Sequence, residues 1–278
     1  MSAAAIAVAA IGLIALVALA YWQLIVAEGA YLGPRVVAWT YDRFAGHYDG
    51  VKQFNAQHER WFVAWPLLRS LGPVREPLVL DVATGTGRLP LALLAEEFRG
   101  QILGLDLSGA MLRQARAKLW PFGEQVSLIQ QDASQLPFDD ATFDAVTSLE
   151  SLEFLPRPDE ALAEMVRVLA PGGVLLVTNR VGREAPLLPG RAIPRPDFEN
   201  LLARLPLHDA EVRPWQENYD LAIALKDGTL DRAGRGGVDL EALLRCPACS
   251  GRLERIGAAL VCTECGHPLA DGAGAERQ

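Results

Sequence analysis

The chain has 278 residues, half of them hydrophobic, and a formal net charge of −8. This length allows one sizeable domain with small appendages. With an isoelectric point near 5.1, the chain has no excess of positive charge to bind a nucleic-acid backbone. An RNA substrate is therefore disfavoured, and nucleic acid is not an expected partner.

The first 27 residues carry no charged side chain, and Ala4 to Val26 is a near-continuous run of Ala, Ile, Leu and Val. About 20 such residues cross the hydrocarbon core of a bilayer. A cleaved signal peptide is the competing interpretation, because Ala18-Leu19-Ala20 resembles a cleavage site, but the basic n-region is missing. A buried soluble helix is a third interpretation. The pattern favours a single-pass membrane anchor over residues 1–30.

Arg35 and Arg43 follow this apolar segment, and no Lys or Arg precedes it. The positive-inside rule therefore predicts that the body of the protein lies in the cytoplasm.

A short apolar run, 78–82, is followed by Ala83-Thr84-Gly85-Thr86-Gly87 and then by a second apolar run, 89–98. This order predicts a strand, a tight turn and a helix. The glycines let the backbone approach a ligand, and the first amides of the helix supply hydrogen-bond donors. Asp81 stands at the carboxyl end of the strand, where an open α/β sheet binds its ligand.

A second strand, 102–106, ends in Asp106, about 20 residues after the turn, where a carboxylate can accept hydrogen bonds from ribose hydroxyls. Ser108 then caps a helix that carries Met111. Further strands are predicted at 126–129, 143–147 and 174–178, a helix at about 158–169, and a closing pair of strands at 210–215 and 220–225. Asp132 and Ala133 lie in a turn where an adenine edge can meet an acid and a backbone amide.

The motifs at 79–90, 102–112, 130–138 and 168–178 resemble, in order and spacing, those of the class I S-adenosylmethionine-dependent methyltransferases. They look most like the type 11 branch, which contains the ubiquinone/menaquinone C-methyltransferases and phospholipid methyltransferases. Ala83 replaces the first glycine of the commonest motif.

This resemblance implies an α/β fold, a Rossmann-like sheet of seven strands flanked by helices, over residues 36–228. It also implies that S-adenosylmethionine is the cofactor and that no metal takes part in the transfer. The residues expected to hold the cofactor are Tyr48, Asp81, Ala83, Thr84, Gly85, Gly87, Asp106, Leu107, Met111, Asp132 and Ala133.

The loop 148–155 follows the fourth strand and should lie beside the methyl donor. Its two carboxylates, Glu150 and Glu153, can hold a cationic or proton-losing substrate. We take Glu150 as the candidate catalytic residue, whereas a solvated helix N-terminus explains Glu153 equally well. The apolar insertion 181–209 suits a lipid-like acceptor or contact with a bilayer surface.

Residues 229–240 are expected to be a linker, because glycines are frequent from Lys226 to Val238. Beyond it, Cys246, Cys249, Cys262 and Cys265 form two C-x-x-C pairs whose spacing predicts a zinc ribbon over 241–270 with one structural Zn²⁺. Disulfides are the alternative. The ribbon resembles small zinc-ribbon proteins that act as methyltransferase partners, so it can itself bind a protein partner. Residues 271–278 are expected to be a disordered tail.

Two classes of function follow. The first is a membrane-tethered methyltransferase acting on a lipophilic small molecule, such as a quinone precursor or a phospholipid amine. The second is a non-catalytic adaptor that binds a partner through its ribbon. Pro90 stands where a nicotinamide-binding fingerprint requires glycine or alanine, and the acidity and the apolar segment oppose an RNA methyltransferase.

Overall fold

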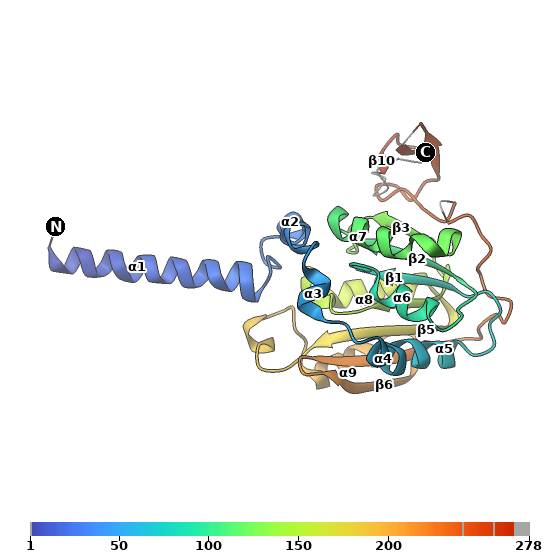
Figure 1. The fold of residues 1–278 in the computed structure, drawn as a ribbon, viewed down its shortest axis with the longest axis horizontal. Coiled ribbons are helices and arrows are strands. Elements are labelled where there is room, and N and C mark those ends of the chain that lie inside the picture. Colours follow the sequence, from blue (N-terminus) through green and yellow to red (C-terminus); the bar gives the residue numbers. More distant parts are fainter. Residues whose placement is uncertain (1, 241, 258, 270–278) are drawn as a thin grey trace.

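The computed structural model describes residues 2–240, 242–257 and 259–269. At its centre lies a seven-stranded sheet with the order β3-β2-β1-β4-β5-β7-β6 (Figure 1). The predicted Rossmann-like sheet is therefore confirmed. The strands are β1 (Leu78–Val82), β2 (Gln101–Asp106), β3 (Val126–Gln130), β4 (Phe143–Ser148), β5 (Leu169–Arg180), β6 (Leu207–Gln216) and β7 (Tyr219–Lys226).

The first five strands are parallel, and β7 pairs antiparallel with both β5 and β6. Parallel strands need helical crossovers, and helices cover both faces of the sheet. The helices of the body are α2 (Pro34–Phe44), α3 (Tyr48–Lys52), α4 (Ala56–Glu59), α5 (Trp65–Leu71), α6 (Arg88–Leu94), α7 (Gly109–Leu119), α8 (Pro158–Val168) and α9 (Arg195–Ala203), and a π-helical turn, η2 (Arg60–Ala64), joins α4 to α5.

Each strand sends alternate side chains to opposite faces, which divides the core in two. Val79 packs with Leu67 of α5, Leu93 of α6 and Ala115 of α7 on one face. Its neighbours Leu78 and Leu80 pack with Leu162 of α8 and Phe198 of α9 on the other. The carboxyl ends of β1, β2 and β4 are thus held at one edge of a rigid sheet.

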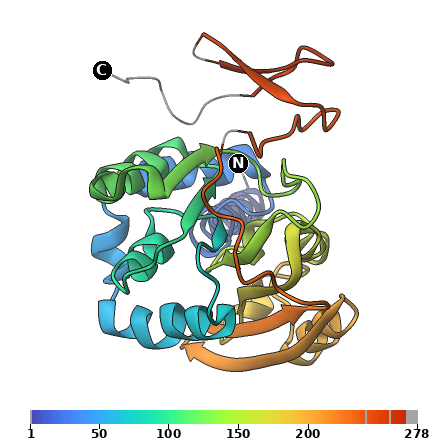
Figure 2. The same ribbon diagram turned by 90° about the vertical axis from the view of Figure 1, so that its right-hand side faces the viewer.

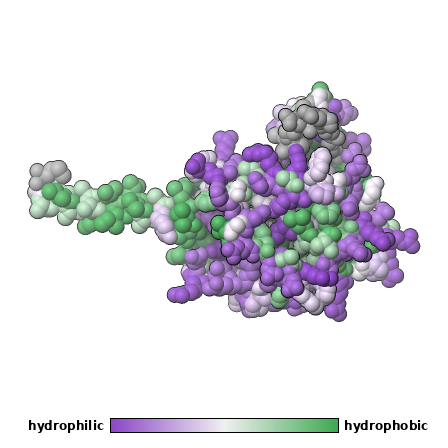
Figure 3. All heavy atoms as spheres, in the orientation of Figure 1, coloured by the Kyte–Doolittle hydropathy of each residue, from purple (hydrophilic) through white to green (hydrophobic). Residues whose placement is uncertain are grey.

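The apolar segment near the N-terminus forms α1 (Ala3–Tyr21) and a π-helical turn, η1 (Trp22–Val26). The helix over Ala3–Val26 is long and apolar enough to cross a membrane, and none of it is buried inside the protein. Figure 3 shows it as a hydrophobic rod that projects from a largely polar body.

The foot of this helix is part of the body. Ala27 and Ala30 are buried, Trp22 Nε1 donates to the Leu187 carbonyl at 2.9 Å, and the Tyr31 hydroxyl donates to the Pro189 carbonyl at 2.9 Å. The body therefore begins before residue 36, and the apolar insertion packs against the helix.

The segment predicted as a linker is packed rather than loose. It runs along the end of the sheet opposite α1 (Figures 1 and 2). The Gly236 amide donates to the Glu76 carbonyl at 2.7 Å, and Arg235 contacts Asp144 of β4. The expectation of a glycine linker with few contacts is therefore corrected.

The C-terminal ribbon consists of β8 (Leu253–Ile256), β9 (Ala259–Cys262) and β10 (Pro268–Leu269) in one antiparallel sheet. An isolated bridge pairs Leu244 with Phe138, and Leu244 and Leu260 belong to the same buried cluster as the sheet core. The ribbon is thus docked on the main domain. The predicted tail 271–278 lies outside the described residues.

Candidate functional site

The predicted glycine turn joins β1 to α6. Ala83, Gly85 and Gly87 all have positive φ, of 57°, 56° and 85°, and this conformation strains the alanine. A Cβ on Gly85 would meet no atom within 4 Å, whereas one on Gly87 would lie 2.9 Å from Leu119. Gly85 therefore borders open space, and Gly87 allows α6 to pack against α7.

Asp106 connects the turn to β2. Its Oδ2 accepts a hydrogen bond from the Gly85 amide at 2.7 Å, and its Oδ1 accepts one from the Ser108 amide at 2.8 Å. Burial nevertheless raises the pKa of Asp106 to about 6. The Asp106 carboxylate is thus held in place at the edge of the pocket. Because burial destabilises its ionised form, further hydrogen-bond donors from a ligand would stabilise it.

Asp81 lies at the end of β1 and is 3% exposed. The Thr147 hydroxyl donates to its Oδ1 at 2.8 Å. Burial raises the pKa of Asp81 to about 7, so two acids with raised pKa values flank the glycine turn. Such perturbed acids in a cleft are typical of a functional site.

A pocket with about 750 Å³ of empty space, its open mouth included, lies at the carboxyl ends of the strands. Nine residues named from the sequence line it: Tyr48, Ala83, Gly85, Asp106, Leu107, Met111, Asp132, Ala133 and Glu150. Asp81 and Thr84 line an adjoining cavity of about 340 Å³ that shares the turn with it. Residues that are far apart in the sequence are thus brought to one place.

The loop after β4, expected beside the methyl donor, lines the pocket with Phe154 and Leu155, but the contribution of α2 was not predicted. Pro34, Val37 and Tyr41 of α2 complete this apolar wall. The Tyr41 ring meets the Phe154 ring edge to face, with centroids 5.5 Å apart. The spacing of Val37 and Tyr41, four residues apart on an amphipathic helix, was the available signal.

Glu150 is held in a network of charges. Its Oε2 accepts from Lys52 Nζ at 2.5 Å, and its Oε1 accepts from Arg88 Nη1 at 2.6 Å. Burial alone would raise the pKa of Glu150, but Lys52 and Arg88 outweigh it and hold this pKa below its ordinary value. Both oxygens of Glu150 are thus already paired, which opposes its use as a free carboxylate for a cationic substrate, and its catalytic role stays a prediction.

Arg88 is the centre of this network and was missed from the sequence. It donates to both oxygens of Glu59, at 2.8 and 2.6 Å, and its guanidinium lies over Phe54 and Trp215, 4.3 and 4.7 Å from the ring centroids. These contacts join α4, α6 and β6 beside the glycine turn. Their long sequence separation left no local signal.

Glu153 is not a solvated helix terminus. It is 1% exposed and accepts a hydrogen bond from the Tyr219 hydroxyl, with Arg180 Nη1 3.7 Å from its Oε1. Burial raises its pKa. Glu153 thus joins the loop after β4 to β5 and β7.

The structure brings the four cysteines together, with every Sγ atom within 4.8 Å of the others. The Cys246–Cys265 and Cys249–Cys262 sulfur pairs are 3.6 and 3.4 Å apart. These separations exceed a covalent disulfide of about 2.0 Å. The Ala248 amide lies 3.4 Å from Cys246 Sγ and the Glu264 amide 3.4 Å from Cys262 Sγ, as expected for short C-x-x-C turns that hold thiolates. The donor set fits a tetrahedral Cys₄ centre.

Comparison with known proteins agrees with this geometry. Residues 80–177 match a family model described as a methyltransferase domain. This region is a class I methyltransferase domain. The chain is 36% identical over 152 residues to the ubiquinone/menaquinone biosynthesis C-methyltransferase UbiE of Syntrophotalea carbinolica, which covers 54% of this chain and 63% of that protein. The match thus spans less than two thirds of that relative.

Solved structures share the fold of this methyltransferase domain. A Methanococcus maripaludis protein assigned as an S-adenosyl-L-methionine-dependent methyltransferase superposes with a TM-score of 0.54 at 19% identity, covering 68% of this chain and 94% of that chain. A structure of the complex between the Haloferax volcanii Trm112 methyltransferase activator and a methyltransferase gives a TM-score of 0.52 at 22% identity, covering 67% of this chain and 97% of that chain.

Proposed function

We propose that this chain is a membrane-tethered S-adenosylmethionine-dependent methyltransferase that acts on a lipophilic small molecule, such as a quinone precursor or a phospholipid amine. One observation supports the proposal most directly. The same pocket is lined by Asp106, Asp132 and the glycine turn and by the apolar residues of α2 and of the 154–156 loop. This apolar wall begins a few residues after the apolar N-terminal helix.

The residues of the pocket fit the cofactor. Asp106 lies where ribose hydroxyls can donate to it, Asp132 and Ala133 offer an acid and an amide to an adenine edge, and Met111 and Leu107 supply an apolar surface for its ring. The N-terminus of α6 and the turn around Gly85 supply amides for the amino-acid portion. When bound, S-adenosylmethionine supplies an electrophilic methyl group.

The protein's part in the reaction is then positioning and exclusion of water. The apolar wall of Val37, Tyr41 and Phe154 orients a lipophilic acceptor, a proximity effect that can lower a barrier by several kcal/mol. Glu150, paired with Lys52 and Arg88, acts as a positioning residue that holds α3 and α6 beside the turn.

The experiment is mass spectrometry of a membrane lipid extract incubated with the full-length protein and methyl-labelled S-adenosylmethionine. We expect label in a quinone-like or an amine-bearing lipid, and no label with the Asp106→Ala variant. Absence of label from every lipid, with cofactor binding intact, would reject the lipophilic acceptor and favour the adaptor hypothesis.

We also infer that the four-cysteine cluster holds one structural Zn²⁺. Four thiolates complete the coordination of the ion and leave no open position for catalysis. Because the ribbon already packs on Phe138 of its own chain, its first partner is the methyltransferase domain itself.

A further inference from the structure

The outer surface of α2 differs from its pocket-lining surface. Arg35, Trp39 and Arg43 follow one another at intervals of four residues and so share one face of the helix. All three are exposed, Trp39 by 55%. The guanidinium of Arg43 lies 5.6 Å from the centroid of the Trp39 ring.

The opposite face of α2 is committed to the body. Pro34, Val37 and Tyr41 line the pocket. Asp42, three residues after Trp39 and so beside the stripe rather than opposite it, accepts hydrogen bonds from the Ser108 hydroxyl at 2.6 Å and from the Ala110 amide at 3.0 Å, which ties α2 to the start of α7. The orientation of the exposed stripe is therefore fixed by the fold.

The position of α2 along the chain puts this stripe close to the end of the apolar helix. The 24 residues of Ala3–Val26 make a helix of about 36 Å, slightly longer than the roughly 30 Å hydrocarbon core. Figure 1 shows α2 beside the foot of α1. In this view α2 is seen nearly end-on, whereas α1 lies across the view, so the two helices are steeply inclined to each other. A helix that crosses a bilayer along α1 would leave α2 lying along the bilayer surface.

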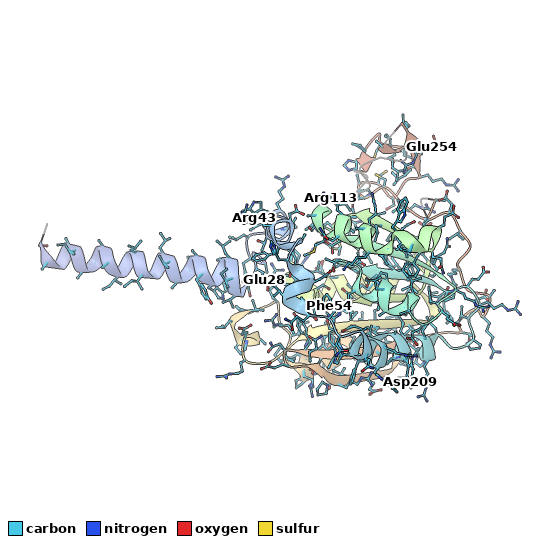
Figure 4. All side chains as sticks on the ribbon, viewed as in Figure 1. Glu28, Arg43, Phe54, Arg113, Asp209 and Glu254 are labelled. Carbon is cyan, nitrogen blue, oxygen red and sulfur yellow. The ribbon has the colours of Figure 1, made fainter. Side chains whose placement is uncertain are left out.

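The neighbouring surface has the same character. Leu24, Ile25, Leu32 and Leu187 are each at least 41% exposed, and Leu187 accepts the hydrogen bond of Trp22. In Figure 4, Arg43 of α2 and Glu28 lie near the end of the body that α1 joins, whereas Asp209 lies at the lower edge of the body. Apolar, aromatic and basic groups thus gather at one end of the molecule.

From these observations we propose that α2 is an interfacial helix whose Arg35–Trp39–Arg43 stripe binds an anionic bilayer surface while its other face forms the pocket wall. Arginines attract anionic headgroups, and a tryptophan suits the boundary between headgroups and acyl chains. The bilayer thereby holds the pocket wall in place, and a lipophilic acceptor enters beside α2 directly from the membrane. The entry route rests on the proposed methyl transfer to a lipophilic acceptor, whereas the contact of α2 with lipid rests only on the proposed membrane tether.

The test uses the full-length protein in nanodiscs of phosphatidylcholine, alone or mixed with phosphatidylglycerol, in which some lipids carry bromine high on the acyl chain. Bromine quenches a nearby indole. The Trp39 signal is the difference in emission between the wild-type protein and Trp39→Phe. The matched control is Trp120→Phe, because Trp120 is 78% exposed and follows α7, at the end of the sheet away from the pocket.

We expect bromolipids to quench the Trp39 signal and to leave the Trp120 signal unchanged. The double variant Arg35→Glu/Arg43→Glu should stay in the membrane through α1 but lose most of the Trp39 quenching and its increase with phosphatidylglycerol. The control Arg69→Glu/Arg99→Glu makes the same charge change at exposed positions near the opposite end of the sheet and should behave as wild type.

A Trp39 signal as insensitive to bromolipid as that of Trp120 would overturn the proposal. So would equal quenching in the two double variants. Methyl transfer to a lipid extract without Trp39 quenching would leave the proposed function standing and reject the interfacial helix. Quenching without methyl transfer would support the interfacial helix and reject the proposed methyl transfer to a lipid.

Discussion

Arg235 forms an ion pair with Asp144 at the end of the sheet opposite the pocket. Arg235 Nη1 donates to Asp144 Oδ1 at 2.8 Å, and the Arg235 amide donates to Oδ2 at 2.8 Å. The Asp144 carboxylate is completely buried, and it also accepts from the Leu78 amide at 2.9 Å. The segment after β7 is thus required to compensate a charge inside the methyltransferase domain.

We predict that Arg235→Ala destabilises the whole domain. Removing one partner of a fully buried pair costs about 3–5 kcal/mol, and we expect less here, about 2 kcal/mol, because the arginine side chain is 31% exposed. Urea unfolding followed by circular dichroism measures this loss. The exposed neighbour Arg232 gives the control: Arg232→Ala should be neutral, and equal stability of the two variants would contradict the role of Arg235.

Chelation of zinc should weaken the main domain as well as the ribbon. The Arg245 amide donates to the Pro137 carbonyl at 2.7 Å, and Leu244 and Leu260 are 2% and 4% exposed. Exposing such a leucine costs about 1.5–3 kcal/mol, and 1 kcal/mol moves Tm by about 2–4 °C in a domain of this size. Calorimetry before and after chelation should show a fall on the order of 5 °C that added Zn²⁺ reverses. An unchanged Tm would mean that the ribbon folds independently.

Glu150 should contribute to stability rather than to proton transfer. Glu150→Gln removes the charge that Lys52 and Arg88 share, at a cost of about 2 kcal/mol. This is less than for a fully buried pair, because Arg88 retains Glu59. Since the folded pKa of Glu150 is lowered, its contribution is complete above the unfolded pKa and is lost as the pH falls.

The difference between Glu150→Gln and wild type should therefore be largest near pH 7 and shrink toward pH 4. Unfolding titrations at the two pH values measure it. The exposed pair of Glu160 with Arg157 supplies a control, Glu160→Gln, with little expected effect. A variant of normal stability whose methyl transfer loses its dependence on pH would instead favour Glu150 as a base.

The affinity for the cofactor should rise with pH. The pKa values of Asp106 and Asp81 are raised to about 6 and about 7 in the free protein, so both acids become protonated as the pH falls below these values. Hydroxyl and ammonium donors of the ligand favour the ionised acids, and binding below about pH 7 must therefore release protons.

Calorimetry with S-adenosylhomocysteine in buffers of different ionisation enthalpy counts these protons. We expect a steeper rise in affinity for wild type than for Asp106→Asn, in which only Asp81 still titrates. Affinity that is flat or that increases toward acid pH would be the contrary result.

The sequence allowed the fold and much of the pocket to be predicted, because their signals are local. The run from Leu78 to Leu94 carries its own strand, turn and helix pattern, and Asp106 follows a recognisable strand. The pairs Glu150–Arg88 and Asp144–Arg235 are separated by 62 and 91 residues, and no periodicity connects them. The glycines of 228–237 resembled a flexible linker, yet Gly234 and Gly236 lie where a Cβ would approach the Glu76 carbonyl oxygen to within 2.2 and 2.7 Å.

The most direct test of the account is the affinity of the full-length protein for S-adenosylhomocysteine, measured by calorimetry at neutral pH for wild type and Asp106→Ala. Hydrogen bonds to a charged group contribute about 1.5–3 kcal/mol, so the variant should bind roughly ten- to a hundred-fold more weakly. Asp227→Ala, at an exposed acid at the far end of β7, should bind as wild type does. Equal affinity of wild type and Asp106→Ala, or no binding by the wild-type protein, would contradict the assignment of this pocket to S-adenosylmethionine.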